Sequence, residues 1–123
     1  MSDVVRLTIP AVLAYVRLPR VAIAGLATRS GFSYDEVEDL RLAVGEACQV
    51  LLDGADRNGT LTVAFSVERG TLGVEVTSDG PVGRHEGGER LSGQLLAATV
   101  GSVEVSEEGR RIRFTMTAAE EDD

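Results

Sequence analysis

The chain has 123 residues and a formal net charge of −8 at pH 7, and 43% of its residues are hydrophobic, which fits one folded domain. The negative charge argues against direct nucleic-acid binding, the absence of lysine excludes a phosphate-loop lysine, and a single histidine and a single cysteine argue against a structural zinc site. Because no apolar run approaches the ~18 residues of a membrane span and the N-terminus does not resemble a signal sequence, we expect a cytoplasmic protein without a membrane segment.

The N-terminal part of the chain predicts a strand followed by a helix. Residues 4–9 (VVRLTI) are rich in β-branched side chains and alternate in polarity, and Pro10 is expected to end this strand. Since Pro19 lacks the N–H that would bond back to Tyr15, we expect the first helix to begin near Pro19, after a bent first turn. Gly31 is suited to the C-cap of that helix.

A second helix is predicted over residues 33–52, where Ser33 and Glu36 have the spacing of a capping box. Its apolar stripe recurs at intervals of three and four residues and consists of Val37, Leu40, Val44, Ala47 and Leu51. Cys48 lies close to the centre of this stripe, which predicts a buried small hydrophobe. Glu46 lies on the opposite side, where spacing alone favours a solvated glutamate.

The second half of the chain predicts two hairpins separated by a glycine-rich segment. The expected elements are strands 60–68 and 71–78 joined at Arg69-Gly70, a loop over 78–93, a short helix over 94–100 and a hairpin over 102–117 that turns near Gly109. Residues 118–123 are expected to form an acidic, frayed tail, so the single domain is expected to cover residues 1–117. Segregated helices and strands favour the α+β class, with a mixed, mainly antiparallel sheet and helices on one face.

Arginine is concentrated at the N-terminal end of the chain. Residues 1–31 hold four arginines against Asp3, a balance of +3, which leaves −11 for the remainder. Arg17 and Arg20 are one turn apart on one face near the start of the first helix. This asymmetry suggests a partner-binding surface, although bare arginines are equally typical of a solubilising face. From the residues alone, the sequence shows no convincing active site.

The stretch GFSYDEVEDLRLAVGEAC, residues 31–48, resembles the RsbW/SpoIIAB anti-sigma factors, which are serine kinases with the ATP-binding fold of gyrase, histidine kinases and MutL. The similarity covers residues 6–117 and is specific over 20–52. It implies a Bergerat-type two-layer sandwich that binds an alternative sigma factor and an anti-anti-sigma protein with a STAS domain, usually as a homodimer. Arg20 matches a family arginine at the partner-binding face.

The resemblance also identifies departures from the family's nucleotide site. Glu46 matches the glutamate that polarises a water or a substrate hydroxyl, so it is interpreted as a catalytic remnant. Val50 replaces the asparagine that binds Mg²⁺, and an isopropyl group cannot coordinate a hard cation. Ser78 replaces the aspartate that reads the adenine amino group, and Asp79 substitutes for it only if the loop shifts by one residue.

Two glycines of the nucleotide site are retained. Gly80 matches the glycine that follows the adenine-reading position, and Gly93 is retained near the last glycine motif, where Arg90 and Ser92 occupy glycine positions. Degenerate motifs of this kind predict no cofactor, and ATP with Mg²⁺ is expected only as residual binding.

The sequence therefore predicts an anti-sigma factor that sequesters an alternative RNA polymerase sigma factor and is released by a STAS partner, without kinase activity. Two alternatives remain open at this point. One is an active ATP-dependent serine kinase that phosphorylates the STAS partner. The other is a pseudokinase adaptor in a different partner-switching circuit.

Overall fold

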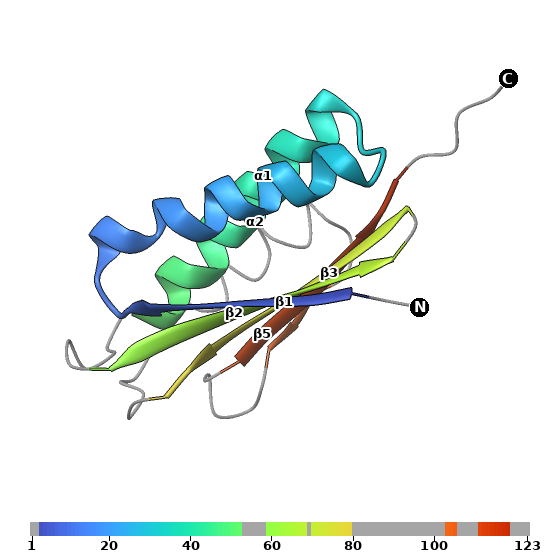
Figure 1. The fold of residues 1–123 in the computed structure, drawn as a ribbon. Helices are drawn as coiled ribbons and strands as arrows, with labels where there is room; N and C mark the ends of the chain where they lie inside the picture. The colour runs from blue at the N-terminus through green and yellow to red at the C-terminus, as the bar shows by residue number, and fades with distance from the viewer. Residues whose placement is uncertain (1–2, 53–58, 69, 80–102, 106–110, 119–123) are drawn as a thin grey trace, which may run out of the picture.

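The computed structural model describes residues 3–52, 59–68, 70–79, 103–105 and 111–118. The elements are, in order, β1 (Asp3–Pro10), the 3-10 turn η1 (Leu13–Tyr15), α1 (Arg17–Arg29), α2 (Tyr34–Leu52), β2 (Thr60–Glu68), β3 (Thr71–Ser78), β4 (Val103–Val105) and β5 (Arg111–Thr117). Both helices lie on the same face of the sheet, which gives two layers (Figure 1). The predicted α+β sandwich is confirmed. Neither described helix is long and apolar enough to cross a membrane.

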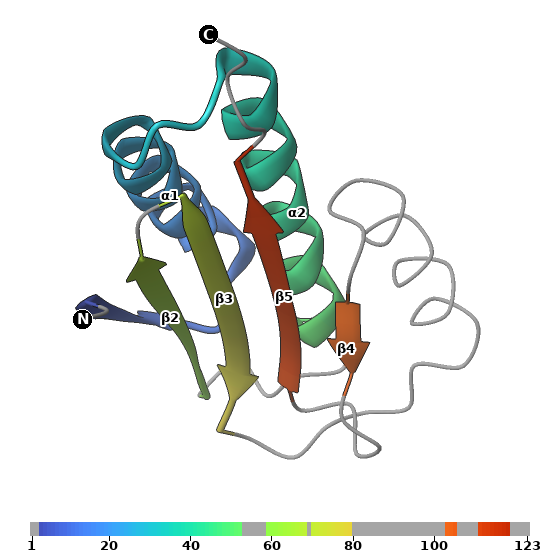
Figure 2. The same ribbon diagram turned by 90° about the vertical axis from the view of Figure 1, so that its right-hand side faces the viewer.

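Within the described residues, the sheet has five strands in the order β1-β2-β3-β5-β4, and each described pairing is antiparallel. Figure 2 shows the strands side by side, with α2 behind β5. The first hairpin turns as predicted, because Glu68 pairs with Thr71 and Gly70 has a φ of +76°, a backbone conformation that favours glycine. The second hairpin also forms, with Val105 opposite Ile112.

Several predicted segments lie outside the described residues. These are the glycine-rich loop beyond Asp79, the short helix at 94–100, the turn near Gly109 and the end of the acidic tail. Strand β1 runs one residue further than expected, since Pro10 pairs with Thr60. Proline is tolerated there because β1 is an edge strand, where a missing N–H need not interrupt the ladder.

Helix α1 begins at Arg17, two residues before the expected start. Pro19 lies within the first turn, where backbone N–H groups have no acceptor inside the helix, so its missing N–H removes no helical hydrogen bond. The turn η1 precedes it and provides the bent entry that the proline predicted.

The connection between the two helices contains capping bonds on both sides. At the end of α1, Gly31 has a φ of +88°, and the Phe32 N–H donates to the Ala27 carbonyl at 3.2 Å. This is the Schellman arrangement that Gly31 predicted. At the start of α2, the Ser33 N–H donates to Glu36 Oε1 at 2.8 Å and the Glu36 N–H donates to Ser33 Oγ at 3.2 Å. The capping box is confirmed in both directions.

The core lies between the helices and the sheet. The predicted stripe of α2 is buried throughout, and Cys48 is fully buried beside it. The sheet supplies alternate residues, and the largest side chains with almost no exposure include Phe65, Phe114, Leu61 and Ile112. Strand alternation turns the intervening side chains to the opposite face. Among the described elements, no helix covers that opposite face (Figure 1).

Candidate functional site

A groove of about 330 Å³ lies between the start of α1 and the middle of α2. We call it the α1–α2 groove. The lining residues that matter most here are Leu13, Arg17, Arg20, Arg41, Leu42 and Glu46. Its three arginines and one glutamate give a net charge of +2 on a chain whose total is −8. The groove is therefore a locally basic surface on an acidic protein.

Helical spacing explains why these side chains meet. On α2, Leu42, Gly45, Glu46 and Gln49 recur at intervals of three and four, so they share one face. On α1, Arg17 and Arg20 are three residues apart and face the same groove. The structure thus brings together Glu46, expected as a catalytic remnant, and the two arginines expected to bind a partner.

Gly45 forms part of the groove floor beneath Arg20. A Cβ built on Gly45 would lie 3.5 Å from Arg20 Cδ and 3.7 Å from Arg20 Nε. Both are ordinary van der Waals distances. The missing side chain at residue 45 allows the Arg20 side chain to cross α2 closely.

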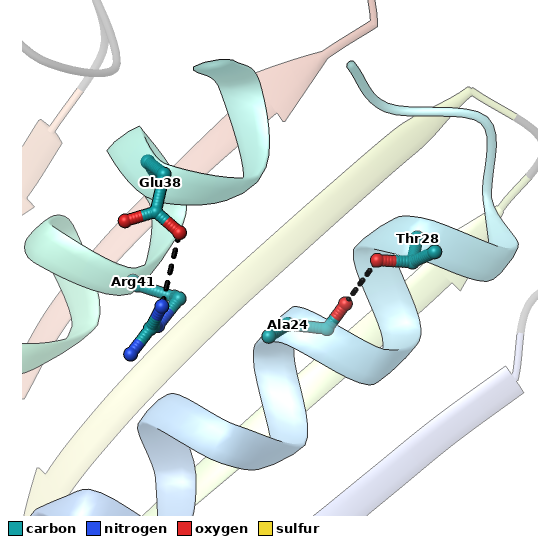
Figure 3. Close-up of polar contacts among 4 residues, drawn as sticks. All are labelled: Ala24, Thr28, Glu38 and Arg41. Atoms are coloured by element: carbon teal, nitrogen blue, oxygen red, sulfur yellow. Dashed lines mark hydrogen bonds and ion pairs between the residues drawn. The ribbon is translucent and has the colours of Figure 1, made fainter. Parts of the chain in front are cut away.

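Arg41 is a groove residue that the sequence analysis missed. Its Nη1 contacts Glu38 Oε1 at 2.9 Å, as Figure 3 shows, while its buried Nε has no hydrogen-bond partner among the described residues. On α1, the Thr28 hydroxyl donates a hydrogen bond to the Ala24 carbonyl of the same helix at 2.8 Å (Figure 3).

Leu13 and Leu42 add apolar surface to the same groove. Leu13 is 62% exposed and Leu42 is 46% exposed. Neither side chain belongs to the apolar patterns used to predict the core, so no local pattern indicated that they line a groove. The sequence could have identified Arg41 as a neighbour of this site, because Arg41 precedes Gly45 by four residues and therefore lies on the same side of α2.

Glu46 is half-buried and makes no hydrogen bond or ion pair within the described part of the chain. Val50, one turn later, is only 6% exposed and belongs to the hydrophobic core. The residue expected from the resemblance to replace a Mg²⁺-binding asparagine is therefore a buried aliphatic side chain. Within the described ranges, no three His, Cys, Asp or Glu side chains are grouped to hold a metal ion.

Ser78, which was expected to replace an adenine-reading aspartate, lies at the end of β3. Ser78 is buried there, on the same side of the strand as the core residues Val74 and Val76. Asp79 is exposed, and its Oδ1 accepts a hydrogen bond from the Thr60 N–H at 2.7 Å. The Asp79 N–H in turn donates to the Thr60 carbonyl at 3.2 Å. Asp79 thus closes the end of the β2–β3 ladder.

The bond from the Thr60 N–H lowers the pKa of Asp79 below its usual value of 3.8, since it stabilises the carboxylate. Successive residues of a strand face opposite sides, so an aspartate at residue 79 does not take the place of one at residue 78. Gly80 and Gly93, the other residues expected to contact a nucleotide, lie outside the described residues.

Comparison with known proteins agrees with this fold. The chain matches the family model of the histidine kinase-like ATPase domain over residues 9–116. It is 38% identical over 82 residues to the serine-protein kinase RsbW of Bacillus subtilis, covering 64% of this chain and 51% of that protein. It is 37% identical over 83 residues to the serine-protein kinase RsbW of Listeria innocua, covering 65% of this chain and 53% of that protein.

The chain spans about half the length of these relatives. Among solved structures, it is similar to the RsbU and RsbW domains of Rv1364c from Mycobacterium tuberculosis, with a TM-score of 0.70 and 16% identity, over 94% of this chain and 32% of that one. At this identity the likeness concerns the fold. The family match over residues 9–116 shows that the chain belongs to the histidine kinase-like ATPase domain family.

Proposed function

We propose that the protein is a cytoplasmic anti-sigma factor that sequesters an alternative RNA polymerase sigma factor by stoichiometric binding and is released by an anti-anti-sigma STAS partner. The observation that carries this proposal is the α1–α2 groove, a basic and partly apolar surface on an RsbW-type fold of net charge −8.

The chemistry of the groove defines the partner surface that fits it. Arg17, Arg20 and Arg41 line the groove and offer guanidinium donors. Leu13 and Leu42 offer apolar contact. An amphipathic helix with acidic residues on one side fits this groove. Its carboxylates would pair with the arginines, and its apolar side chains would pack against the leucines.

We further propose that phosphoryl transfer plays no part in this function. Mg²⁺ neutralises the β- and γ-phosphates in such reactions, and the buried Val50 offers it no oxygen ligand. The loss of one charge-assisted hydrogen bond at Ser78 removes about 1.5–3 kcal/mol of nucleotide binding, roughly a ten- to hundredfold drop in affinity. Asp79 does not compensate, since its carboxylate is bound to Thr60. The described residues therefore do not fit ATP with Mg²⁺.

The main rival is an active serine kinase, which the retention of Glu46 and the names of the relatives favour. To test it, the protein is mixed with labelled ATP, Mg²⁺ and a candidate STAS protein. We expect no labelled product. Transfer that disappears in Glu46→Ala would establish the kinase instead.

Binding itself is measured with purified sigma factor by titration calorimetry. We expect Arg20→Glu to weaken sigma binding about tenfold or more while the circular dichroism spectrum is unchanged. Arg29→Glu is the matched control, because Arg29 lies on the same helix and outside the groove. If the two variants bind the sigma factor with equal affinity, Arg20 is not part of the interface. Recovery of a STAS protein but no sigma factor from native lysate would favour an adaptor of another circuit.

A further inference from the structure

Strand β1 lies at an edge of the sheet, because it pairs with β2 on one side and with no described strand on the other (Figure 2). Such a strand presents backbone N–H and C=O groups that have no partner in the sheet, and proteins often protect it with lysine, with an internal proline or with a bulge. In β1 these devices are missing: the chain contains no lysine, the register with β2 is unbroken, and the proline is the last residue. Within the described residues, the edge is open to another strand.

One hydrogen bond fixes which residues of β1 turn their backbone groups outward. The Ala11 N–H donates to the Gly59 carbonyl at 3.0 Å, in continuation of the register between β1 and β2. Residues that bond to the partner strand alternate with residues whose N–H and C=O point away from it, so the odd-numbered residues of β1 bond to β2 and the even-numbered ones face outward. Pro10 agrees with this count, since a proline at an outward position removes no bond to β2. The outward residues with a free N–H are Val4, Arg6 and Thr8.

Apolar side chains are exposed on both faces of the sheet along this edge. Neighbouring residues of a strand point to opposite faces, yet Val4 is 48% exposed and Val5 is 41% exposed. A strand added beside β1 removes apolar surface from water on both faces at once. The hydrophobic effect therefore favours such an addition.

On the helix side, α1 adds apolar surface along the same edge. Helix α1 lies over β2, whereas α2 lies over β3 and β5 (Figure 2). Ala22 and Leu26 are one turn apart on the flank of α1 opposite to Arg20, which faces α2. Both residues, like Leu7 of β1, are partly buried hydrophobics packed against the core. Side chains of an added strand that point to the helix layer should therefore be apolar.

On the open face, the neighbours of β1 indicate which polar side chains an added strand should carry. Arg6 is exposed and makes no ion pair within the described ranges. On the same face, Arg113 and Glu75 are register partners and form an ion pair at 2.7 Å, so a carboxylate opposite Arg6 repeats an arrangement that the sheet already uses. Thr8 contacts Thr62 through the two hydroxyl oxygens at 3.0 Å, so a hydroxyl group also suits the position opposite Thr8.

We propose that the free edge of β1 binds an extended segment of another protein by β-strand addition, with alternate apolar side chains and a carboxylate opposite Arg6. Main-chain hydrogen bonds to the outward N–H and C=O groups provide affinity, and the alternating side chains provide specificity. All described pairings of this sheet are antiparallel, and in that orientation the segment reads threonine, apolar, glutamate, apolar, valine from its N-terminus. The α1–α2 groove stays free, so this inference does not depend on sigma binding.

The test follows amide hydrogen exchange by NMR in the full chain, with a capped synthetic peptide whose core is threonine-valine-glutamate-valine-valine. In the free protein, we expect the amides of Val4, Arg6 and Thr8 to exchange freely, whereas those of Val5 and Leu7 are protected. Saturating peptide should slow the exchange of the first three amides about tenfold or more, because each then donates to the added strand. A control peptide of the same composition, with its valines adjacent, should leave their exchange unchanged.

Two substitutions at Thr8 form a matched pair, because both remove the hydroxyl contact with Thr62. Thr8→Pro also removes the outward N–H, and it should weaken peptide binding about tenfold or more in an NMR titration. Thr8→Val keeps this N–H and should bind the peptide about as tightly as the wild type. Equal affinities of the two folded variants would overturn the proposal.

Charge exchange at Arg6 tests the side-chain contact, whether or not Thr8→Pro folds. Arg6→Glu should weaken binding of the glutamate peptide about fivefold, and a peptide with lysine in place of that glutamate should recover the affinity. Circular dichroism establishes that each variant is folded. The proposal is overturned if the glutamate peptide does not slow exchange in the wild type, or if the lysine peptide restores no affinity. Protection that rises with protein concentration without peptide would also overturn it, because a second copy would then occupy the edge.

Discussion

The side chain of Arg20 on α1 lies over Gly45 of α2, at a distance that leaves room for a methyl group and no more. An alanine Cβ at residue 45 would touch Arg20 Cδ at 3.5 Å, which is a normal contact. A longer side chain has to displace the guanidinium group from the groove. Substitutions at residue 45 can therefore test the stability of α2 and the proposed partner binding independently.

The first prediction concerns this position. Gly45→Ala should raise the free energy of unfolding by about 0.5–1 kcal/mol, because glycine in a helix interior is less favourable than alanine by that amount. Urea denaturation measures this change, and sigma affinity should stay unchanged. Gly45→Leu should instead weaken sigma binding while the domain remains folded. Unaltered affinity in the leucine variant would mean that Arg20 does not act from its present position.

The second prediction concerns acid stability and Asp79. The Thr60 N–H lowers the pKa of this carboxyl in the folded state, so the unfolded chain binds its proton first as the pH falls. The stabilising contribution is therefore present above pH 3.8 and is lost as the pH falls below that value, through the lower folded-state pKa. Asp79→Asn should flatten this part of the pH–stability curve in urea melts between pH 6 and pH 2. Asp39→Asn is the control, since Asp39 is exposed on α2 and makes no ion pair among the described residues. If both variants keep the wild-type slope, the ladder-closing role of Asp79 is wrong.

The third prediction concerns the only thiol. Burial raises the pKa of Cys48 to about 12, because the thiolate is not solvated in the core. We expect no reaction of the native protein with a thiol reagent at pH 8, and complete reaction after unfolding in urea. Since the raised pKa favours the protonated folded state, its contribution to stability is full below the ordinary value of 9.0 and declines as the pH rises toward 12. Rapid labelling of the native protein would show that the end of α2 opens.

The fourth prediction concerns the nucleotide. Calorimetry of the wild type with ATP should show no affinity gain on addition of Mg²⁺, because Val50 provides no ligand. Val50→Asn alone should cost about 1–3 kcal/mol of stability, since it buries an amide among apolar side chains. Combined with Ser78→Asp, it should introduce binding that depends on Mg²⁺. Strong magnesium-dependent binding by the wild type would refute the stoichiometric mechanism.

Local patterns predicted α2 almost completely. The capping bonds between Ser33 and Glu36 and the buried stripe depend on residues three and four apart, so the sequence holds the necessary information. Gly31 and the Arg69-Gly70 hairpin were predicted for the same reason. The expected start of α1 was two residues too late, because proline is tolerated throughout the first turn of a helix and not only at its first residue.

Long-range contacts were beyond this reasoning. The bond between Asp79 and Thr60 joins residues that are distant in sequence, and nothing local to Asp79 indicates its acceptor role. The meeting of Arg41 with Arg17 and Arg20 likewise depends on how α1 crosses α2. Family resemblance supplied Glu46 as a site residue, but only the packed helices show that it shares a groove with arginines.

The short link between α1 and α2, which has capping hydrogen bonds on both sides, has a consequence for how the proposed sigma factor would be released. Because Gly31 ends one helix and Ser33 begins the next, the capped link leaves few residues that could act as a hinge between the two helices. In the proposed mechanism, a competing partner therefore releases the sigma factor by occupying the same surface, and the concentration of that competitor sets how much sigma factor is free.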